Sequence, residues 1–214
     1  MTAPPGPHIL LADDHAVLRA GLRRLFESAG LRVVGEAETG EQACQLHAEL
    51  QPHVLVMDLS MPGMGGIEAL RRVRQRDARA RVVILSMHES ATFATQALRA
   101  GALGYVAKSA AADELIEAVQ QAAQGRVFIS AAIARQMASS RRPPGTDPAT
   151  QLSSREFEIF RLLAEGQGLE AIAARLHISM KTVANHQTMI KQKLRVGTPI
   201  ELVRLALQHG IVAG

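Results

Sequence analysis

The chain has 214 residues, of which 47% are hydrophobic, and this length and composition suit two ordinary domains with proper cores. No stretch approaches the roughly 18 apolar residues of a membrane span, and the start lacks the basic and apolar regions of an export signal. The single cysteine, Cys44, excludes an internal disulfide and a Cys-based zinc site. We therefore expect a soluble protein of the reducing cytoplasm, with no membrane partner.

Charge is divided unevenly along the chain. Residues 1–126 hold 13 Lys and Arg against 14 Asp and Glu, whereas residues 127–214 hold 11 against 6. The basic excess belongs to the C-terminal part and suggests a polyanionic partner there. Since many solvated surfaces reach a similar charge, a motif must decide whether that partner is nucleic acid.

Residues 7–126 alternate short apolar runs with segments of helical period. The runs predict strands at 8–12, 31–37, 53–57, 81–85 and 103–107; the segments between and after them predict helices at 15–29, 40–50, 66–76, 90–100 and 111–124. Gly30, Gly101 and Gly125 stand just past three of these helices, where a left-handed residue is favoured. Five alternating pairs predict an α/β fold with a doubly wound parallel sheet.

Charged residues follow directly on three of the predicted strands. Asp13 and Asp14 follow the first strand, Asp58 follows the third and Lys108 the fifth. The carboxyl ends of parallel strands meet at one edge, where crowded carboxylates repel one another unless a cation lies among them. We therefore expect a hard divalent metal, Mg²⁺, held by Asp13 and Asp14.

A carboxylate beside such a metal can attack phosphorus to form an acyl phosphate. Asp58 stands alone on its strand and is the expected nucleophile. We expect Lys108 to pair with a phosphoryl oxygen and Ser86, after the fourth strand, to offer it a hydroxyl. His15 and His88 flank the site without a third ligand at suitable spacing, so we expect solvent-facing or hydrogen-bonding roles for them.

A linker and a helical domain follow the sheet. A helix at about 131–138 leads into residues 139–148, which are dense in Pro, Gly and charge and have no apolar period. Capping boxes at Ser153 and Thr198 and an N-cap at Ser179 then mark helix starts. We predict four helices: one that ends before Gly166, and three at 169–176, 179–194 and 199–209. The expected domains are 7–126, a connecting helix and linker at 127–150, and an all-α domain at 151–214.

Four motifs resemble the receiver domain of bacterial response regulators: Leu11-Ala12-Asp13-Asp14-His15, Met57-Asp58-Leu59-Ser60-Met61-Pro62-Gly63, Ser86, and Gly104-Tyr105-Val106-Ala107-Lys108. The resemblance implies a flavodoxin-like sheet of strand order 2-1-3-4-5. It also implies that Asp58 takes phosphate from a sensor histidine kinase, that the Ser60 backbone carbonyl completes the metal site of Asp13, Asp14 and Asp58, and that Ser86 and Tyr105 form a switch pair.

The C-terminal pattern is similar to the LuxR-type helix-turn-helix, through Leu152-Ser153, Arg155-Glu156, Ala164-Glu165-Gly166, Ile172-Ala173, Leu176, Ile178-Ser179, Thr182-Val183, His186, Ile190 and Lys193-Leu194. Val183, Ile190 and Leu194 share one face of the 179–194 helix and can pack on the 169–176 helix. The other face is polar and suits a major groove.

Side-chain chemistry divides that polar face into two kinds of contact. Asn185 can pair with adenine, and Thr188 or Ala184 can touch a thymine methyl, so these are candidate base readers. Lys181, Lys191, Lys193 and Arg195 are expected phosphate contacts, and Thr182 is assigned to the same DNA-binding surface.

The C-terminal part departs from the family pattern at three places. Ala184 stands where lysine is usual after Thr-Val, the stretch Gly168-Leu169-Glu170-Ala171 replaces Ser-Asn-Lys-Glu, and Pro199 stands where arginine is common. Fewer phosphate donors place more demand on dimerisation. Leu202, Leu205 and Ala206, with Ile200 and Leu207 nearby, form an apolar stripe on the last helix that serves either as core or as a dimer seam.

These patterns predict a two-domain response regulator of the NarL/FixJ type, in which phosphorylation of Asp58 controls a homodimer on double-stranded DNA. The chief alternative is a regulator of the same fold that works without phosphorylation, through protein or ligand binding. An aspartyl-phosphate phosphatase is a more distant alternative. Such an enzyme needs an acid–base carboxylate two residues after the nucleophile, where this chain has Ser60, so we expect no enzyme and no catalytic residue.

Overall fold

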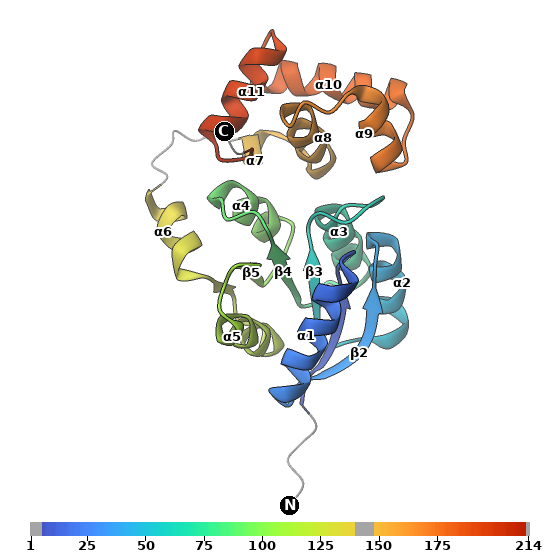
Figure 1. Cartoon of the computed structure of the whole chain (residues 1–214), viewed down its shortest axis with the longest axis vertical. Coiled ribbons are helices and arrows are strands. Elements are labelled where there is room, and N and C mark those ends of the chain that lie inside the picture. The colour runs from blue at the N-terminus through green and yellow to red at the C-terminus, as the bar shows by residue number, and fades with distance from the viewer. Residues whose placement is uncertain (1–5, 140–147, 213–214) are drawn as a thin grey trace, which may run out of the picture. The chain divides into compact units, whose positions relative to one another are not determined.

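The computed structural model describes residues 6–139 and 148–212 (Figure 1). Backbone contacts divide the chain into two compact units, Met1–Met87 with Ala97–Ala131 and His88–Gln96 with Ala132–Gly214. The predicted domain bounds differ from this division at residues 88–96, and they stay a prediction. Residues 140–147, most of the predicted linker, lie outside the described part of the chain. No helix of the described ranges is long and apolar enough to cross a bilayer.

The first unit is built on a parallel sheet of order β2-β1-β3-β4-β5-β6. Its strands are β1 (His8–Ala12), β2 (Arg32–Ala37), β3 (Val54–Asp58), β4 (Val82–Ser86), β5 (Gly104–Ala107) and β6 (Phe128–Ile129). The predicted order of the first five strands is confirmed. The prediction of five strands in all is wrong, because Phe128 and Ile129 pair with β5 inside the segment assigned to the connector. Two residues are too few to give a periodic signal.

Helices alternate with the strands as predicted. They are α1 (Ala16–Ser28), α2 (Gly40–Leu50), α3 (Gly66–Arg76), α4 (Ala91–Arg99) and α5 (Ala112–Ala123). Gly30, Gly101 and Gly125 have φ of 76°, 100° and 75°, which a residue with a side chain rarely adopts. These glycines therefore end α1, α4 and α5 at the predicted places.

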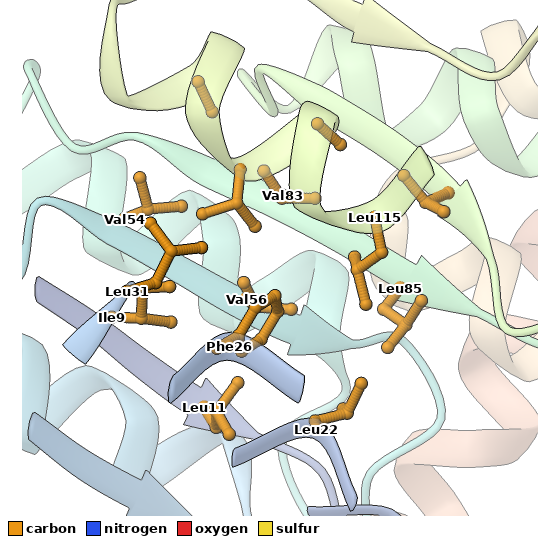
Figure 2. Close-up of a cluster of buried hydrophobic side chains, with 14 of the residues drawn as sticks. Ile9, Leu11, Leu22, Phe26, Leu31, Val54, Val56, Val83, Leu85 and Leu115 are labelled. Atoms are coloured by element: carbon orange, nitrogen blue, oxygen red, sulfur yellow. The ribbon is translucent and has the colours of Figure 1, made fainter. Parts of the chain in front are cut away.

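Strand alternation puts two apolar faces on the sheet. Ile9 and Leu11 of β1 point to one face together with Val54 and Val56 of β3, where they meet side chains of α1 and α5 (Figure 2). Phe26 is fully buried in this cluster. Because β1, β3 and β4 are apolar on both faces, they can lie only in the middle of the sheet. The polar residues that follow them are consequently held at its edge.

Helices make up the second unit. Besides residues 88–96 it contains most of α6 (Ala131–Ser139) and all of α7 (Pro148–Gln151), α8 (Ser154–Ala164), α9 (Leu169–Leu176), α10 (Met180–Leu194) and α11 (Pro199–Gln208). The four predicted C-terminal helices are confirmed, and α7 is an additional turn of helix. Both predicted capping boxes are present, at Ser153 and Thr198, and the Ser179 side chain accepts from the Thr182 N–H.

The core of the helical unit follows the predicted pattern. Val183 and Ile190 of α10 are fully buried, as is Ile172 of α9. Phe157 and Phe160 of α8 meet edge to face, with ring centroids 6.3 Å apart. This packing fixes α10 through one face and leaves its opposite face to solvent.

Candidate phosphoryl and nucleic-acid sites

Strand register brings the predicted charges to one edge of the sheet. β1 and β3 pair in register to their ends, so Asp13, directly after β1, lies beside Asp58, the last residue of β3. Ser86, the last residue of β4, pairs with Ala107 of β5, and Lys108 follows. The Lys108 main-chain N–H donates to the Ser86 carbonyl at 2.7 Å. The structure therefore gathers the carboxylates, the hydroxyl and the ammonium into one site.

Lys108 bridges two buried carboxylates. Its Nζ lies 2.6 Å from Asp13 Oδ2 and 2.8 Å from Asp58 Oδ2, and all three side chains are at most 5% exposed. Asp14, by contrast, has an exposed side chain on the same loop. One ammonium thus faces three carboxylates, which leaves the site with an excess of negative charge.

The buried Asp58 carboxyl has a perturbed pKa. Burial raises the pKa of Asp58, against the hydrogen bond from Lys108, and the nearby Asp13 raises that pKa further. Burial alone would lower the pKa of Lys108, but its ion pairs with Asp13 and Asp58 outweigh burial and raise that pKa. Within residues 6–139 and 148–212, no protein group hydrogen-bonds to the buried Asp58 Oδ1. A buried carboxylate oxygen of this kind is suited to a divalent cation.

The geometry of the cluster fits a divalent metal ion. Ligand atoms of Asp13, Asp14, Asp58 and His15 lie within 4.8 Å of one another. Carboxylate oxygens are the ligands of hard divalent cations. His15, 66% exposed, places Nδ1 3.1 Å from Asp13 Oδ1 and 3.0 Å from Asp14 Oδ1, which matches its expected solvent-facing and hydrogen-bonding role.

Three further predicted site residues, Ser60, Ser86 and Tyr105, belong to the same unit as this cluster, and His88 belongs to the second unit. Ser60 is half-buried two residues past Asp58, and Ser86 is fully buried at the end of β4. Tyr105 is fully buried in β5. His88 stacks on Phe93 with ring centroids 4.0 Å apart, and burial lowers the pKa of His88 to about 4. The Ser60 carbonyl and the switch pair keep their roles as predictions.

Sequence reasoning missed a charged network behind the acidic edge. Arg19 of α1 is 7% exposed and donates to the Asp13 carbonyl and to Glu36 and Glu38 at the end of β2. One signal was available in the sequence. Arg19 shares its helix face with the buried Leu22, so a charge stands on the apolar side of an amphipathic helix.

The N-terminal half of α10 presents most of the predicted DNA-contacting side chains to solvent. Lys181, Asn185 and Thr188 are exposed, whereas Thr182 and Ala184 are half-buried. The Thr182 hydroxyl lies 2.8 Å from that of the N-cap Ser179, and the Thr188 hydroxyl donates to the Ala184 carbonyl at 3.1 Å. Both hydroxyls therefore have partners within the helix. Lys181 and Asn185 remain the side chains best placed to reach nucleic acid.

Lys193 is held by an ion pair that the sequence did not reveal. Its Nζ lies 2.8 Å and 2.7 Å from the two carboxylate oxygens of Glu156, which is 2% exposed at the start of α8. The same carboxylate accepts from the Ser153 N–H in the capping box. The charge of Lys193 therefore links α10 to α8 in this structure, and its predicted contact with a DNA phosphate stays a prediction. Lys191 is half-buried and keeps its predicted role.

Glu156→Gln is expected to destabilise the helical unit by about 1 kcal/mol at neutral pH, because a partly exposed ion pair is lost while the amide oxygen can still accept from the Ser153 N–H. Burial raises the pKa of Glu156, but Lys193 and Ser153 outweigh it and lower that pKa below 4.5. Because the pKa of Glu156 is lower in the folded state, its ionised carboxylate stabilises the fold above pH 4.5. This contribution is lost as the pH falls through the folded-state pKa. Amide hydrogen exchange of α10 should therefore differ between wild type and variant at pH 7 and converge in acid. The exposed Glu170→Gln is the control; a difference that persists in acid would refute the ionic origin.

The last helix corrects the predicted dimer seam. Leu202 and Ala206 are 2% and 0% exposed, so both belong to the core of the unit and their assignment to a seam is wrong. Leu205 is half-buried. The apolar side chains that α11 exposes are Ile200 and Leu207, at 74% and 43%. With Pro199, Val203 and Arg204 they line a groove of about 420 Å³.

A receiver-like sheet with a buried acidic edge, joined to a helix-turn-helix, defines the class of two-component response regulators. Comparison with known proteins agrees. The family of response regulator receiver domains matches residues 9–120, and the luxR family of bacterial regulatory proteins matches residues 150–206.

Curated relatives and solved structures match nearly the whole chain. The response regulator UvrY of Escherichia coli is 37% identical over 207 residues, and the response regulator GacA of Pseudomonas aeruginosa is 38% identical over 207. These alignments cover 95% of this chain and 95% and 97% of the relatives. RcsB from Salmonella enterica serovar Typhimurium, solved bound to a promoter with the phosphomimetic BeF3−, is 27% identical with a TM-score of 0.69, covering 94% of this chain and 98% of that one. The chain therefore belongs to the NarL/FixJ-type response regulators, which join a receiver domain to a LuxR-type helix-turn-helix.

Proposed function

We propose that phosphorylation of Asp58 by a sensor histidine kinase switches this chain, and that the switched form controls transcription as a homodimer on DNA. The observation that carries the proposal is the Lys108 bridge between Asp13 and Asp58, beside a buried Asp58 oxygen to which no described residue hydrogen-bonds. RcsB, a structural relative, has been solved with DNA and a phosphomimetic together.

Each residue of the acidic edge has a part in the transfer. A carboxylate oxygen of Asp58 attacks the phosphorus of a kinase phosphohistidine, the P–N bond breaks, and its electron pair leaves with the imidazole. Asp13, Asp14, Asp58 and the Ser60 carbonyl would hold Mg²⁺, which when bound neutralises the incoming phosphoryl oxygens. Lys108, already poised over Asp58, exchanges a carboxylate partner for a phosphoryl oxygen.

The hydroxyl of Ser86 stands at the same edge and is the proposed reporter of the phosphoryl group. It would hydrogen-bond a phosphoryl oxygen and move toward it, and Tyr105, buried in the neighbouring strand, would repack. Such a paired movement alters the surface around α4, β5 and α5. A partner that binds this surface would therefore distinguish phosphorylated from unphosphorylated Asp58.

DNA is contacted through α10 and the dimer forms through α11. Asn185, Thr188 and Ala184 would face base edges, while Lys181, Lys191 and the backbone near Thr182 would face phosphates. The α11 groove of Ile200, Val203 and Leu207 replaces the buried Leu202 and Ala206 in the proposed seam, since it is apolar and exposed, and the half-buried Leu205 keeps its predicted place there. A twofold dimer requires two half-sites.

The cytoplasm is the proposed location, because a sensor kinase domain and chromosomal DNA are both met there and the lone Cys44 suits a reducing compartment. Burial raises the pKa of the Cys44 thiol, which keeps it unreactive. An enzymatic role is not proposed: the position two residues past Asp58 is Ser60, so the carboxylate that substrate turnover needs is missing there.

The proposed function is tested by selecting DNA from a random double-stranded pool, with and without acetyl phosphate and Mg²⁺. We expect wild type to enrich a site of two symmetric half-sites, more strongly with acetyl phosphate, and Asp58→Asn to lose that increase. No enrichment in any arm would reject DNA binding. Equal enrichment in every arm would favour the alternative, a regulator of this fold that works without phosphorylation.

The same selection separates the dimer from the DNA contact. Ile200→Glu places a charge in the apolar groove, so we expect it to enrich single half-sites only. Val17→Glu is the matched control, since Val17 is 89% exposed on α1, in the first unit. Paired half-sites in the Ile200→Glu arm would show that the α11 groove is not the seam.

A further inference from the structure

Each of the three side-chain nitrogens of Arg19 lies against an acceptor of the same unit. Its Nη1 donates to the Asp13 carbonyl at 2.6 Å, Nη2 to Glu38 Oε1 at 2.6 Å, and Nε to Glu36 Oε2 at 3.3 Å. The side chain is 8% exposed. A guanidinium with a planar fork of donors that is held at three points has little freedom to rotate.

The main chain of Asp13 is held on both sides. Its N–H donates to the Ala37 carbonyl of β2 at 3.1 Å, and its carbonyl accepts from Arg19. The Arg19 N–H in turn donates to the His15 carbonyl at 3.0 Å, which closes the loop from β1 to α1. Removal of the guanidinium would free one side of the residue that carries a carboxylate of the acidic site.

The network adds rigidity to the site with little added positive charge. Glu36 of β2 and Glu38, just past its end, both accept hydrogen bonds from Arg19, and Glu36 also accepts one from Arg23. Two positive guanidinium groups are therefore balanced by two negative carboxylates. The hydrogen bond from Arg23 is the largest influence on Glu36 and lowers the pKa of its carboxyl, which keeps it ionised. A balanced network of this kind orients a neighbouring ligand without repelling a cation.

We infer that Arg19 is a positioning residue for the divalent-metal site: it fixes the Asp13 main chain so that the Asp13 carboxylate faces Asp58. The inference rests on the proposed function of the acidic edge. Partners that orient a metal ligand typically account for tenfold or more in metal affinity. Arg19→Met keeps an unbranched apolar stem and removes every side-chain donor, so the variant should bind Mg²⁺ about tenfold more weakly.

Arg23→Met is the matched control. Arg23 lies one turn further along α1, shares the partner Glu36, and has its hydrogen bonds with Glu36, Glu27 and the Val33 carbonyl rather than with Asp13. The Arg23→Met variant therefore loses a comparable ion pair, while the Asp13 carbonyl keeps its hydrogen bond from Arg19. We expect its Mg²⁺ affinity to stay within about twofold of wild type.

The experiment measures Mg²⁺ binding to the full chain by calorimetry, without a phosphodonor, together with amide exchange of residues 13–15 in EDTA. Faster exchange and weaker binding in Arg19→Met alone support the inference. Equal losses in both variants, or none in Arg19→Met, overturn it while leaving the proposed function intact. If wild type takes up no Mg²⁺, the proposed site fails and the inference falls with it.

A measurement on wild type alone covers the case in which Arg19→Met does not fold. Mg²⁺ should shift the side-chain nitrogen NMR signals of Arg19 and leave those of Arg23 in place, because of these two arginines Arg19 is the one that hydrogen-bonds to Asp13. Unshifted Arg19 signals in Mg²⁺-bound protein would overturn the inference.

Discussion

Asp58→Asn is expected to abolish phosphoryl uptake from acetyl phosphate in the presence of Mg²⁺. An amide in place of the carboxylate cannot attack phosphorus to form an acyl phosphate, so the loss should exceed about 100-fold. The fold should survive, because the amide oxygen can still accept the hydrogen bond that Lys108 now gives to Asp58 at 2.8 Å. Intact-protein mass spectrometry measures the gain of one phosphoryl group directly.

Asp113→Asn is the control for this prediction. It makes the same isosteric change at an exposed position in the first turn of α5. Undiminished phosphorylation of Asp58→Asn would place the acceptor elsewhere. Uptake by wild type that proceeds equally in EDTA would argue against the metal, because three carboxylates with one ammonium repel an incoming phosphoryl group.

Asn185→Ala and Lys181→Ala are expected to weaken DNA binding in two distinguishable ways. Loss of a paired hydrogen bond to a base costs about 1–3 kcal/mol at the preferred site, so Asn185→Ala should bind that site roughly 5- to 150-fold more weakly and bind other sequences nearly as before. Lys181→Ala should weaken binding to all sequences alike and reduce the salt dependence, the slope of log K on log salt, by about 1. Titrations of the selected site and of a scrambled site at several salt concentrations separate the two.

Lys193→Ala is the matched control on the same helix. Because Lys193 is paired with Glu156, its loss should leave the salt slope unchanged and instead lower the stability of α10. A slope that falls as much as for Lys181→Ala would mean that the ion pair opens on DNA. Full affinity of Asn185→Ala at the selected site would remove Asn185 from the base readers.

The local sequence pattern was sufficient to predict the helices and strands and to place the acidic residues at one edge of the sheet. An apolar run that can be buried on both faces must be a central strand, and its first polar residue then falls at the sheet edge. Asp13, Asp58 and Lys108 could therefore be brought together before any distance was known. Helix caps such as Ser153 and Thr198 were equally readable, since a cap and its partner lie three residues apart.

The local sequence pattern could not predict which residues pair when they lie far apart in the chain. Lys193 and Glu156 are 37 residues apart, and periodicity makes both merely polar residues on helices. The α11 stripe shows the same limit. A helix of ten residues offers apolar side chains on more than one face, and the sequence cannot tell whether Leu202 or Ile200 meets the core.

The sequence by itself determined the order of elements, the first five strands, the acidic edge and the helix-turn-helix, because each depends on spacing within a few residues. Only the tertiary structure decided that β6 joins the sheet, that Arg19 reaches Asp13 and that Ile200 is exposed while Leu202 is buried. These features depend on how segments far apart in the chain pack and on which polar group is left without water, and both are set by the whole fold.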